Sequence, residues 1–583
     1  MKSKIAIIFA FMLITLFSIA VCLADNPIVQ TVYTADPAPM VYNGVCYLYT
    51  GHDADVTVNN FYTMNDWRCF SSTDMVNWTD LGSPLSYTAF SWAKGDCWAG
   101  QCVYRNGKFY YYVPMTQKTG GMAIGVAVAT SPAGPFTDAL GKPLIAHNGS
   151  DDIDPTVFID DDGQAYLYWG HSNLYYVKLN QDMITYSGSV VQVSSKPSNY
   201  VEGPFFYKRN GLYYLVFATI PNPSEDLAYS TSTSPTGPWT YRGIIMAHGS
   251  CYTNQAGICD YNGNSYLFYH NNNLPGGGSF TRSVCLEKFT YNADGSIPTI
   301  NMTPSGPPQI GSLNPYVQTE AETICWSSGL KTEVCSEGGR DVSNIENGDY
   351  LKVKGVNFGS GATSLDARVA SATSGGNIEI HLDSLTGTLV GTCVVQGSGG
   401  WQTWVTKSCT ISGATGIHDV YFKFIGGSGY LLNFNWWKFN SGTSSSGGTY
   451  ARFRNAATGL YIDGMGSTAN GSNACQWGNS NSNNQQWTII NSGSYGMIQN
   501  RATGLYLDGM GNTANGSVCG QLSYSGSNAQ QWAEETSGSY VRFKNRQTGL
   551  YLDGMGSTGN GSNLCQWSNS ASTNQQWQIQ QIQ

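Results

Sequence analysis

Charged side chains are scarce in this chain. Asp, Glu, Lys and Arg make up 11% of the residues, and 38 acidic against 29 basic side chains leave a net charge of −9 at pH 7. So little positive charge disfavours nucleic acids and anionic membranes as partners. Aromatic residues make up 13% of the chain, and glycine is abundant. Because apolar sugar faces stack on rings and hydroxyls bind amides, this composition favours carbohydrate as the partner.

Long apolar runs are missing after the first 24 residues. Residues 1–24 carry Lys2 and Lys4 before an apolar run from Ile5 to Val21, which predicts a cleavable secretory signal. No later run approaches the about 20 residues that span a bilayer. We therefore predict a secreted protein with no membrane partner, and a chain of 583 residues should divide into three or four domains.

Cysteine spacing typical of zinc sites is also absent. The chain has 15 cysteines but no Cys-x-x-Cys pair and no cluster of histidines, which argues against structural zinc. Removal of the signal leaves 14 cysteines (15 − 1), an even number that suits disulfides in an oxidising compartment. Candidate pairs are Cys97 with Cys102 and Cys325 with Cys335, although spacing does not fix the connectivity.

What the chain does contain is a recurring hairpin signal. An Asn-Gly or Asp-Gly turn followed by an aromatic-rich strand occurs five times, at intervals of 48 to 63 residues. The turn glycines are Gly44, Gly107, Gly163, Gly211 and Gly263. Each interval suits about four strands, so the repeat predicts an all-β fold with a five-bladed β-propeller.

Equivalent positions in a radial repeat meet at its centre. Counting back eight or nine residues from each turn glycine gives Asp36, Trp98, Asp154, Glu202 and Asn254. Three of these five residues are carboxylates, and a proline follows each within two positions. Acids crowded into one partly dry pocket push their pKa values apart, as glycoside hydrolysis requires of its acid and base. For any one of them alone, a structural turn is the alternative.

The motifs TADPAPMVYNGVCYLYTGHD, DIDPTVFIDDDGQAYLYWG and VEGPFFYKRNGLYYLVFA resemble the family 43 glycoside hydrolases, and the resemblance covers residues 26–312. It points to the arabinofuranosidases and xylosidases that act on arabinoxylan. It implies that Asp36 is the general base, Glu202 the general acid, and Asp154 the residue that orients the acid and tunes its pKa. Such enzymes invert the anomeric centre without a cofactor, and a base-to-acid separation of roughly 6.5–9.5 Å leaves room for the attacking water.

The resemblance also implies substrate-binding residues. Arg282 resembles the arginine that contacts substrate or a catalytic carboxylate in relatives, and Trp98 would form one wall of the sugar pocket. His270 resembles a histidine that lies at a central cation or its water shell. Ordinary core packing is the alternative for both Trp98 and His270. At Asn254-Gln255 relatives often carry Asn-His, so a minor polar contact is expected to differ here.

Residues 316–440 show alternating strands between glycine-rich turns, which predicts a β-sandwich. The motifs GDYLKVKGVNFGSGA, GGWQTW and LLNFNWWKF resemble the family 6 carbohydrate-binding modules. This implies that Tyr350 and Trp401 sandwich a sugar ring and that Asn433 hydrogen-bonds it, with core packing as the alternative for the rings. It also implies that Glu320 and Glu322 help to hold a structural calcium.

A linker is expected at residues 441–448, and residues 449–583 carry a repeat of 45 that resembles the ricin-type lectins and predicts a β-trefoil. Asp463, Asp508 and Asp553 are expected to accept hydrogen bonds from sugar hydroxyls, with Trp477 and Trp567 as ring partners in two of the three units. An Asp-Gly turn without a ligand is the alternative. The tryptophans that close the units should share one core: Trp487, Trp532 and Trp577.

The leading hypothesis is a secreted, monomeric enzyme that releases α-L-arabinofuranosyl groups from arabinoxylan. A β-D-xylosidase is the alternative, because the two sugars present similar hydroxyl spacing. A non-catalytic polysaccharide-binding protein is a hypothesis of another class. The intact set of Asp36, Asp154 and Glu202 argues against it, since a degenerate enzyme usually loses one of the three first.

Overall fold

The computed structural model describes residues 25–220, 224–441, 450–492 and 495–582. The expected signal peptide and residues 442–448 of the expected linker lie outside them. The chain divides into two compact units, residues 1–442 and 443–583. Within the described residues, regular structure consists of β-strands and four short 3-10 helices, and no helix is long and apolar enough to cross a membrane. The expectation of an all-β protein is confirmed.

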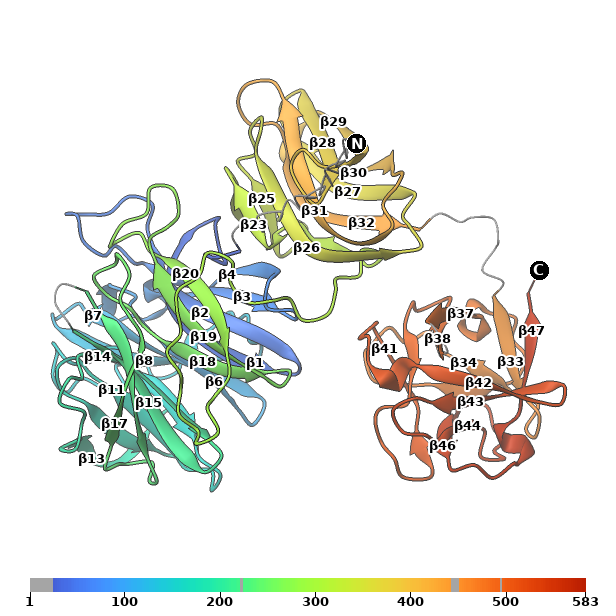
Figure 1. Cartoon of the computed structure of the whole chain (residues 1–583), viewed down its shortest axis with the longest axis horizontal. Coiled ribbons are helices and arrows are strands. Elements are labelled where there is room, and N and C mark those ends of the chain that lie inside the picture. Colours follow the sequence, from blue (N-terminus) through green and yellow to red (C-terminus); the bar gives the residue numbers. More distant parts are fainter. Residues whose placement is uncertain (1–24, 221–223, 442–449, 493–494, 583) are drawn as a thin grey trace, which may run out of the picture. The chain divides into compact units, whose positions relative to one another are not determined.

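Five antiparallel sheets follow one another along the first part of the chain (Figure 1). The first contains β1 (Tyr33–Tyr42), β2 (Val45–Asp53), β3 (Asp66–Ser72) and β4 (Trp78–Ser86), and is followed by helix η1 (Tyr87–Ala89). The second contains β5 (Ala93–Gly95), β6 (Gln101–Arg105), β7 (Lys108–Gln117), β8 (Met122–Ala129) and β9 (Thr137–Asp138). The third contains β10 (Thr156–Ile159), β11 (Ala165–Trp169), β12 (Tyr175–Leu179) and β13 (Tyr186–Gln192). The fourth contains β14 (Glu202–Arg209), β15 (Leu212–Thr219), β16 (Asp226–Ser232) and β17 (Thr240–Met246), and the fifth contains β18 (Gly257–Tyr261), β19 (Asn264–Asn271) and β20 (Ser283–Phe289).

The five predicted turns all join hairpin strands, one in each sheet. Asn43 and Gly44 illustrate why, because both have positive φ, 49° and 75°, as a two-residue hairpin turn of type I′ requires. The expectation of about four strands per repeat fails in the fifth sheet, which has three. The segment before β1 runs beside that sheet, where Ile28 N donates to Val284 O at 2.9 Å.

Aromatic-rich cores join each sheet to the next, and the fifth to the first. Between the first and second sheets, Trp67 and Tyr111 pack with ring centroids 5.8 Å apart. Between the fifth and first sheets, Phe268 meets Trp78 at 5.9 Å. The sheets therefore form a closed ring, which brings the inner strands β1, β10, β14 and β18 toward a common centre.

Residues 319–440 form two further sheets around one apolar core. One contains β21 (Thr319–Glu320), β24 (Lys331–Val334), β25 (Arg340–Ser343), β27 (Ser364–Ser371), β30 (Gly400–Thr410) and β32 (Asn433–Asn440). The other contains β23 (Trp326–Ser328), β26 (Tyr350–Gly359), β28 (Gly375–Leu382), β29 (Leu389–Gln396) and β31 (Gly416–Gly426). The short strand β22 (Thr323–Ile324), which lies between β21 and β23 in the chain, pairs instead with β4 of the first sheet. Asp25 also receives hydrogen bonds from Lys352 and Lys354, so the two parts of this unit share a buried ionic contact.

The second compact unit repeats one pattern three times. Its strands are β33 (Ala451–Asn455), β34 (Tyr461–Asp463), β35 (Ser472–Asn473), β36 (Cys475–Trp477), β37 (Trp487–Ser492), β38 (Tyr495–Asn500), β39 (Tyr506–Asp508), β40 (Ser517–Val518), β41 (Gly520–Leu522), β42 (Trp532–Ser537), β43 (Tyr540–Asn545), β44 (Tyr551–Asp553), β45 (Ser562–Asn563), β46 (Cys565–Trp567) and β47 (Trp577–Gln581). Helices η2 (Asn483–Gln485), η3 (Asn528–Gln530) and η4 (Thr573–Gln575) precede the closing tryptophans. Trp487, Trp532 and Trp577 are fully buried in one cluster, which confirms the predicted shared core.

The cysteines do not pair as expected. All 14 within the described residues are free thiols, so neither Cys97–Cys102 nor Cys325–Cys335 forms a disulfide in this structure. Cys325 instead contacts the carboxylate of Asp25 at 3.3 Å. Two other pairs are in side-chain contact, Cys46 with Cys259 and Cys393 with Cys409. Spacing misled here because strand pairing, not sequence distance, decides which thiols meet.

Candidate active site

One cavity of about 360 Å³ lies at the centre of the five sheets, where residues from all of them meet. Its lining consists of Asp36, Tyr62, Trp98, Ala99, Ser150, Ile153, Asp154, His171, Glu202, Thr253, Asn254, Gln255 and Arg282. Every residue counted back from a turn glycine is among them: Asp36, Trp98, Asp154, Glu202 and Asn254. The structure therefore brings these five side chains together, as the radial repeat predicted.

Backbone strain and bulges aim the acids at the cavity. Asp36 and Asp154 have φ of 53° and 56°, in the left-handed region that costs a non-glycine residue about 1–3 kcal/mol. The pairing of β1 with β2 shifts register between Ala35 and Ala38, around Asp36, and that of β14 with β15 shifts just after Glu202. Such bulges redirect side chains at functional sites. For the third acid, Glu202, the residue with positive φ is its neighbour Gly203, at 62°.

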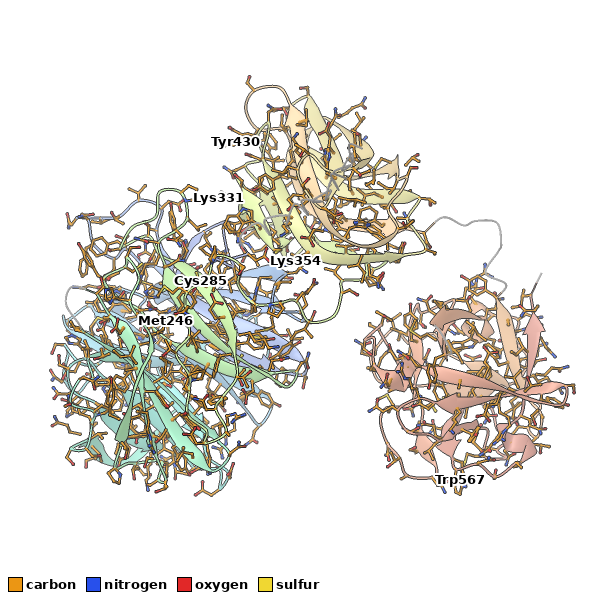
Figure 2. The ribbon with its side chains drawn as sticks, viewed as in Figure 1. Met246, Cys285, Lys331, Lys354, Tyr430 and Trp567 are labelled. Atoms are coloured by element: carbon orange, nitrogen blue, oxygen red, sulfur yellow. The ribbon has the colours of Figure 1, made fainter. Side chains whose placement is uncertain are left out.

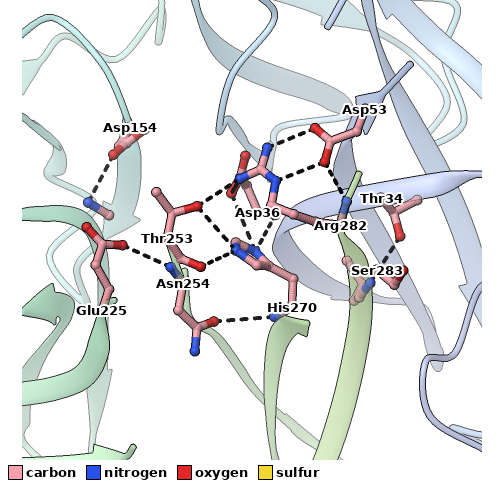
Figure 3. A network of polar contacts seen from close by, with 12 residues as sticks. Thr34, Asp36, Asp53, Asp154, Glu225, Thr253, Asn254, His270, Arg282 and Ser283 are labelled. Atoms are coloured by element: carbon pink, nitrogen blue, oxygen red, sulfur yellow. Dashed lines mark hydrogen bonds and ion pairs between the residues drawn. The ribbon is translucent and has the colours of Figure 1, made fainter. Parts of the chain in front are cut away.

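Arg282 links Asp36 to a second buried acid (Figure 3). Its Nη1 lies 3.0 Å from Asp36 Oδ1, while Nε and Nη2 each lie 2.9 Å from one oxygen of Asp53. The two-pronged contact with Asp53 fixes the guanidinium plane, since both groups are planar and buried. Arg282 therefore contacts a candidate catalytic carboxylate, as the resemblance implied.

His270 supports Asp36 from the other side. Its Nδ1 accepts a hydrogen bond from Asp36 N at 3.3 Å, and its Nε2 donates to Thr253 O at 2.8 Å. Burial, together with Arg282, holds the pKa of His270 well below its usual value, so the ring is neutral. Both ring nitrogens have protein partners, which matches the core alternative and leaves neither free to bind a cation directly. A cation held through water stays a prediction.

Asp154 and Glu202 meet through the backbone. Asp154 Oδ2 accepts a hydrogen bond from Gly203 N at 3.0 Å, which ties the carboxylate to the residue beside Glu202. On its far side Glu202 contacts a further acid, Glu225, whose Oε2 accepts from Asn254 N at 2.9 Å. His171 Nε2 lies 3.9 Å from Glu202 Oε2 and is 44% exposed at the mouth of the cavity. Glu202 therefore contacts one carboxyl group, Glu225, interacts electrostatically with Asp154, and lies near one half-exposed imidazole.

Burial raises the pKa of all four acids that share this site. It raises the pKa of Asp36 to about 6, with repulsion from Asp53 and Glu202 adding to it and Arg282 opposing it. Burial and then repulsion from Glu202 hold the pKa of Asp154 well above its usual value. The pKa of Glu202 is raised by burial and lowered by His171, and that of Glu225 is raised to about 10 by burial and then by Glu202. An ionised Asp36 can therefore coexist with protonated neighbours at neutral pH.

Sequence reasoning missed Asp53, Glu225 and Tyr62. Asp53 ends β2 and Glu225 precedes β16, so neither occupies the position that recurs before each turn. Tyr62 lies between β2 and β3, with Arg282 stacked 4.6 Å from its ring centroid. Trp98 lines the cavity with its ring 6.4 Å from that of Tyr62. The only sequence signal for the missed residues is that acidic and aromatic residues are common around each strand. The same signal also fits residues of the core.

The two rings expected to hold a sugar in the sandwich each have another aromatic neighbour. Tyr350 lies on β26, with its ring 6.2 Å from that of Tyr421. Trp401 lies on β30 of the opposite sheet, and its ring neighbour, at 6.4 Å, is Tyr430, which is 47% exposed (Figure 2). The two predicted rings therefore lie on different sheets, and their pairing around a sugar stays a prediction.

Some polar side chains of the same module form hydrogen bonds with one another. Asn433 is buried and its Nδ2 donates to Glu333 Oε1 at 2.7 Å. Glu320 accepts from Gln318 Nε2 at 3.3 Å. Glu322 is only 3% exposed, and its Oε2 has no hydrogen-bond partner among the described residues. Burial raises the pKa of Glu322 to about 9, with repulsion from Glu320 adding to it.

The three repeated aspartates occupy equivalent turns in the second unit. Each is 4% exposed and accepts a hydrogen bond from the backbone N–H two residues on, at 2.6 to 2.7 Å. They are Asp463, Asp508 and Asp553. This is the local geometry of an Asx turn, so the turn alternative accounts for one oxygen of each carboxylate. Trp477 and Trp567 are half-buried, and in the middle unit Tyr524 packs 5.6 Å from Tyr506.

The cavity has the parts of an acid/base hydrolase for an uncharged substrate. Asp36, Glu202 and Asp154 converge in a space lined by rings and amides. Two carboxyl groups of separated pKa values are the equipment of glycoside hydrolysis. The first part of the chain is therefore a glycoside hydrolase.

Comparisons with known proteins identify the family. The model for glycosyl hydrolases family 43 matches residues 24–297, that for carbohydrate binding module (family 6) matches 320–441, and that for the ricin-type beta-trefoil lectin domain-like group matches 435–522 and 528–583. An arabinoxylan arabinofuranohydrolase of Bacillus subtilis (strain 168) is 36% identical over 484 residues, covering 71% of this chain and 92% of that protein. The chain belongs to glycosyl hydrolases family 43.

Two further comparisons show how much of this chain the relatives share. The crystal structure of a glycoside hydrolase family 43 arabinoxylan arabinofuranohydrolase from Bacillus subtilis, in complex with cellotetraose, aligns with a TM-score of 0.65 at 35% identity, covering 72% of this chain and 98% of that one. A xylosidase/arabinosidase 43A of Humicola insolens is 30% identical over 327 residues, which are 47% of this chain and 98% of that protein. The first matches through the sandwich module, whereas the second matches a span close to that of the catalytic part.

Proposed function

We propose that this enzyme releases α-L-arabinofuranosyl groups from arabinoxylan with inversion at the anomeric carbon. The observation that carries the proposal is the convergence of Asp36, Asp154 and Glu202 in one cavity. The relative that matches 71% of the chain is an arabinoxylan arabinofuranohydrolase, which supports this substrate. The scarcity of charge along the chain suits a neutral polysaccharide.

In the proposed mechanism, Asp36 takes a proton from water while that water attacks the anomeric carbon. Arg282 and His270 hold the Asp36 carboxylate and its backbone in place. Glu202 donates its proton to the departing oxygen, so the bond from water forms as the glycosidic bond breaks. Asp154, bonded to Gly203 N, fixes the strand that carries Glu202, while burial raises the pKa of Glu202.

A β-D-xylosidase acting on xylan or xylo-oligosaccharides is the second candidate. The xylosidase/arabinosidase of Humicola insolens favours it, because its match covers 98% of that protein's length. A non-catalytic polysaccharide-binding protein has no such support. The convergence of Asp36, Asp154 and Glu202 in one cavity argues against it.

For the architecture, we propose a five-bladed β-propeller and, in the second unit, a β-trefoil. The closed ring of five sheets and the threefold repeat of 45 support them. We also propose that the enzyme is secreted, on the strength of residues 1–24, and that it acts as a monomer. Both later modules would hold it on xylan, with Tyr350, Trp401 and Asn433 as sugar contacts in the sandwich and the three repeated aspartates in the other module.

A structural calcium in the sandwich is proposed at Glu320 and Glu322. The unpartnered Oε2 of buried Glu322 fits a missing cation, which would neutralise both carboxylates. Calcium titration of chelator-treated protein should raise its thermal unfolding temperature by a few degrees, whereas the Glu322→Gln variant should not respond. An equal response of the variant would contradict this site.

The proposed reaction is tested by sugar release from wheat arabinoxylan, resolved by chromatography, beside an Asp36→Ala control. Release of arabinose alone is the expected result, and release of xylose would favour the second candidate. The anomer first formed, observed by NMR at early times, tests inversion. No release above the control would favour a binding protein.

A further inference from the structure

Two thiols of the sandwich meet where the edges of its two sheets come together. Strand β29 is the last strand of one sheet, and β30 is the last strand of the other. Cys393 lies on β29 and Cys409 on β30, and their side chains are in contact at the apolar core that the sheets share. Because β29 and β30 belong to different sheets, a covalent bond between these residues would join the two sheets directly.

The backbone explains why the two thiols meet. Just beyond β30, Ser412 N donates to Val390 O on β29 at 2.9 Å. One residue further along each strand, a Cβ placed on Gly391 would lie 2.5 Å from Ile411 Cδ1. Residue numbers rise on one strand as they fall on the other, so the strands run in opposite directions. Because side chains alternate along a strand, two further residues on each strand lead from this contact to the two thiols.

The burial of both thiols fits this register. On β29, Cys393 is fully buried, while the residues on either side of it are exposed. On β30, Cys409 is half-buried, and the residues on either side of it are again exposed. Opposed residues of neighbouring antiparallel strands have Cα atoms about 4.5–5.5 Å apart, which lies inside the range of about 4.4–6.8 Å that a disulfide spans. The backbone therefore allows the bond without moving either strand.

The two thiols differ in accessibility and acidity. Cys409 is the more exposed, and the hydrogen bond from Cys393 lowers the pKa of its thiol. The same hydrogen bond, and then burial, raise the pKa of the Cys393 thiol. Thiol–disulfide exchange begins with an accessible thiolate. Cys409 is therefore the thiol that attacks an incoming disulfide, and Cys393 is the thiol that resolves the mixed disulfide.

We propose that Cys393 and Cys409 form a disulfide that joins the two edge strands of the sandwich when the protein meets an oxidising thiol–disulfide pool. Cys409 attacks one sulfur of a small disulfide such as oxidised glutathione and releases one thiol, and Cys393 then displaces the second thiol from Cys409. In all, the protein thiols lose two protons and two electrons, which the small disulfide gains as it becomes two thiols. The inference does not depend on the substrate of the enzyme, since the bond lies outside the cavity.

The bond would act on the strand that carries an expected sugar contact, because Trp401 also lies on β30. Edge strands have backbone groups that are open to another chain. A bond between β29 and β30 keeps the two strands opposed and restricts the segment between them when it opens. We therefore expect oxidation to slow the local opening of both strands.

Peptide mapping tests the bond itself. The full-length protein is equilibrated with oxidised and reduced glutathione, unfolded in an alkylating reagent, and digested without reduction. Mass spectrometry should find two peptides joined through Cys393 and Cys409, lighter by two hydrogens than the sum of the free peptides. Cys335, which is buried in the same module and accepts a hydrogen bond from Glu337 N, should be alkylated. Alkylation of both Cys393 and Cys409, or a link from Cys409 to another cysteine, would overturn the proposal.

Hydrogen exchange provides a local readout of the joined strands. Amides of β29 and β30 should exchange about tenfold more slowly in the oxidised protein than after reduction. Cys409→Ser should abolish this difference, and so should Cys393→Ala, which introduces no polar group into the core. The matched control Cys335→Ser should keep the difference. Equal exchange in the oxidised and reduced wild type would overturn the proposed role of the bond, as would a difference that persists in Cys409→Ser.

Discussion

The repeats of the five-sheet ring differ from one another at the cavity, whereas the repeats of the threefold unit are alike. In the ring, the five equivalent positions meet at one cavity and carry different residue types, among them Asp36, Trp98 and Asn254. In the threefold unit, Asp463, Asp508 and Asp553 are identical and each keeps the same hydrogen bond to its own turn. A repeat diverges where its members meet to form one site, and it stays uniform where each member keeps its own surroundings.

The largest effect should come from breaking the single site. Glu202→Gln removes the proton donor but keeps shape, so turnover of arabinoxylan should fall about 10²- to 10⁴-fold with the fold retained. Steady-state kinetics and circular dichroism would measure both. Asp463→Asn in the repeated unit is the matched control and should leave hydrolysis of a small glycoside unchanged. Near-wild-type turnover by Glu202→Gln would refute its role as the acid.

The threefold core should respond uniformly. Trp532→Ala removes a fully buried ring whose Nε1 donates to Leu507 O at 3.1 Å, and should cost about 3–5 kcal/mol of the unfolding free energy of this unit. Trp487→Ala and Trp577→Ala should cost the same within about 1 kcal/mol, as measured by denaturant unfolding. Losses that differ by several-fold would show that the three repeats are not energetically equivalent.

Removal of the repeated unit should separate binding from catalysis. A chain ending at residue 440 should hydrolyse a soluble aryl glycoside at the full rate, because the cavity is formed by the other compact unit. On insoluble xylan its rate should fall about tenfold, since linked weak sites raise local concentration. Equal losses on the two substrates would contradict a targeting role for residues 441–583.

The smallest effect should be a shift in pH dependence. The raised pKa of Asp36 predicts that kcat/KM falls as pH drops through about 6, because the base is then protonated. Glu225→Leu removes a hydrogen bond that lowers the pKa of Glu202, so the alkaline limb should move up by about one pH unit. Glu225→Gln keeps a donor and should restore the limb. An unmoved alkaline limb in Glu225→Leu would show that Glu225 does not tune the acid.

Short sequence patterns predicted much of the fold and half of the residues of the site. The Asn-Gly turns need positive φ, so each hairpin can be recognised from two residues, and the count back from the turn glycine reached Asp36 and Asn254. Arg282 and His270 came from the resemblance alone. The expected disulfides failed because Cys97 and Cys325 lie where neighbouring strands, not nearby residues, decide the contact.

By itself, the sequence determined the five hairpins, the repeat of 45 and the positions of Asp36, Asp154 and Glu202, because turn geometry and side-chain alternation act over a few residues. Only the tertiary structure decided that Arg282 is clamped by Asp53, 229 positions away, and that Glu202 contacts Glu225. It also decided that Tyr430 is a ring neighbour of Trp401. These contacts exist only once the ring of sheets closes and the two sheets of the sandwich pack, since burial and proximity between distant segments leave no period in the chain.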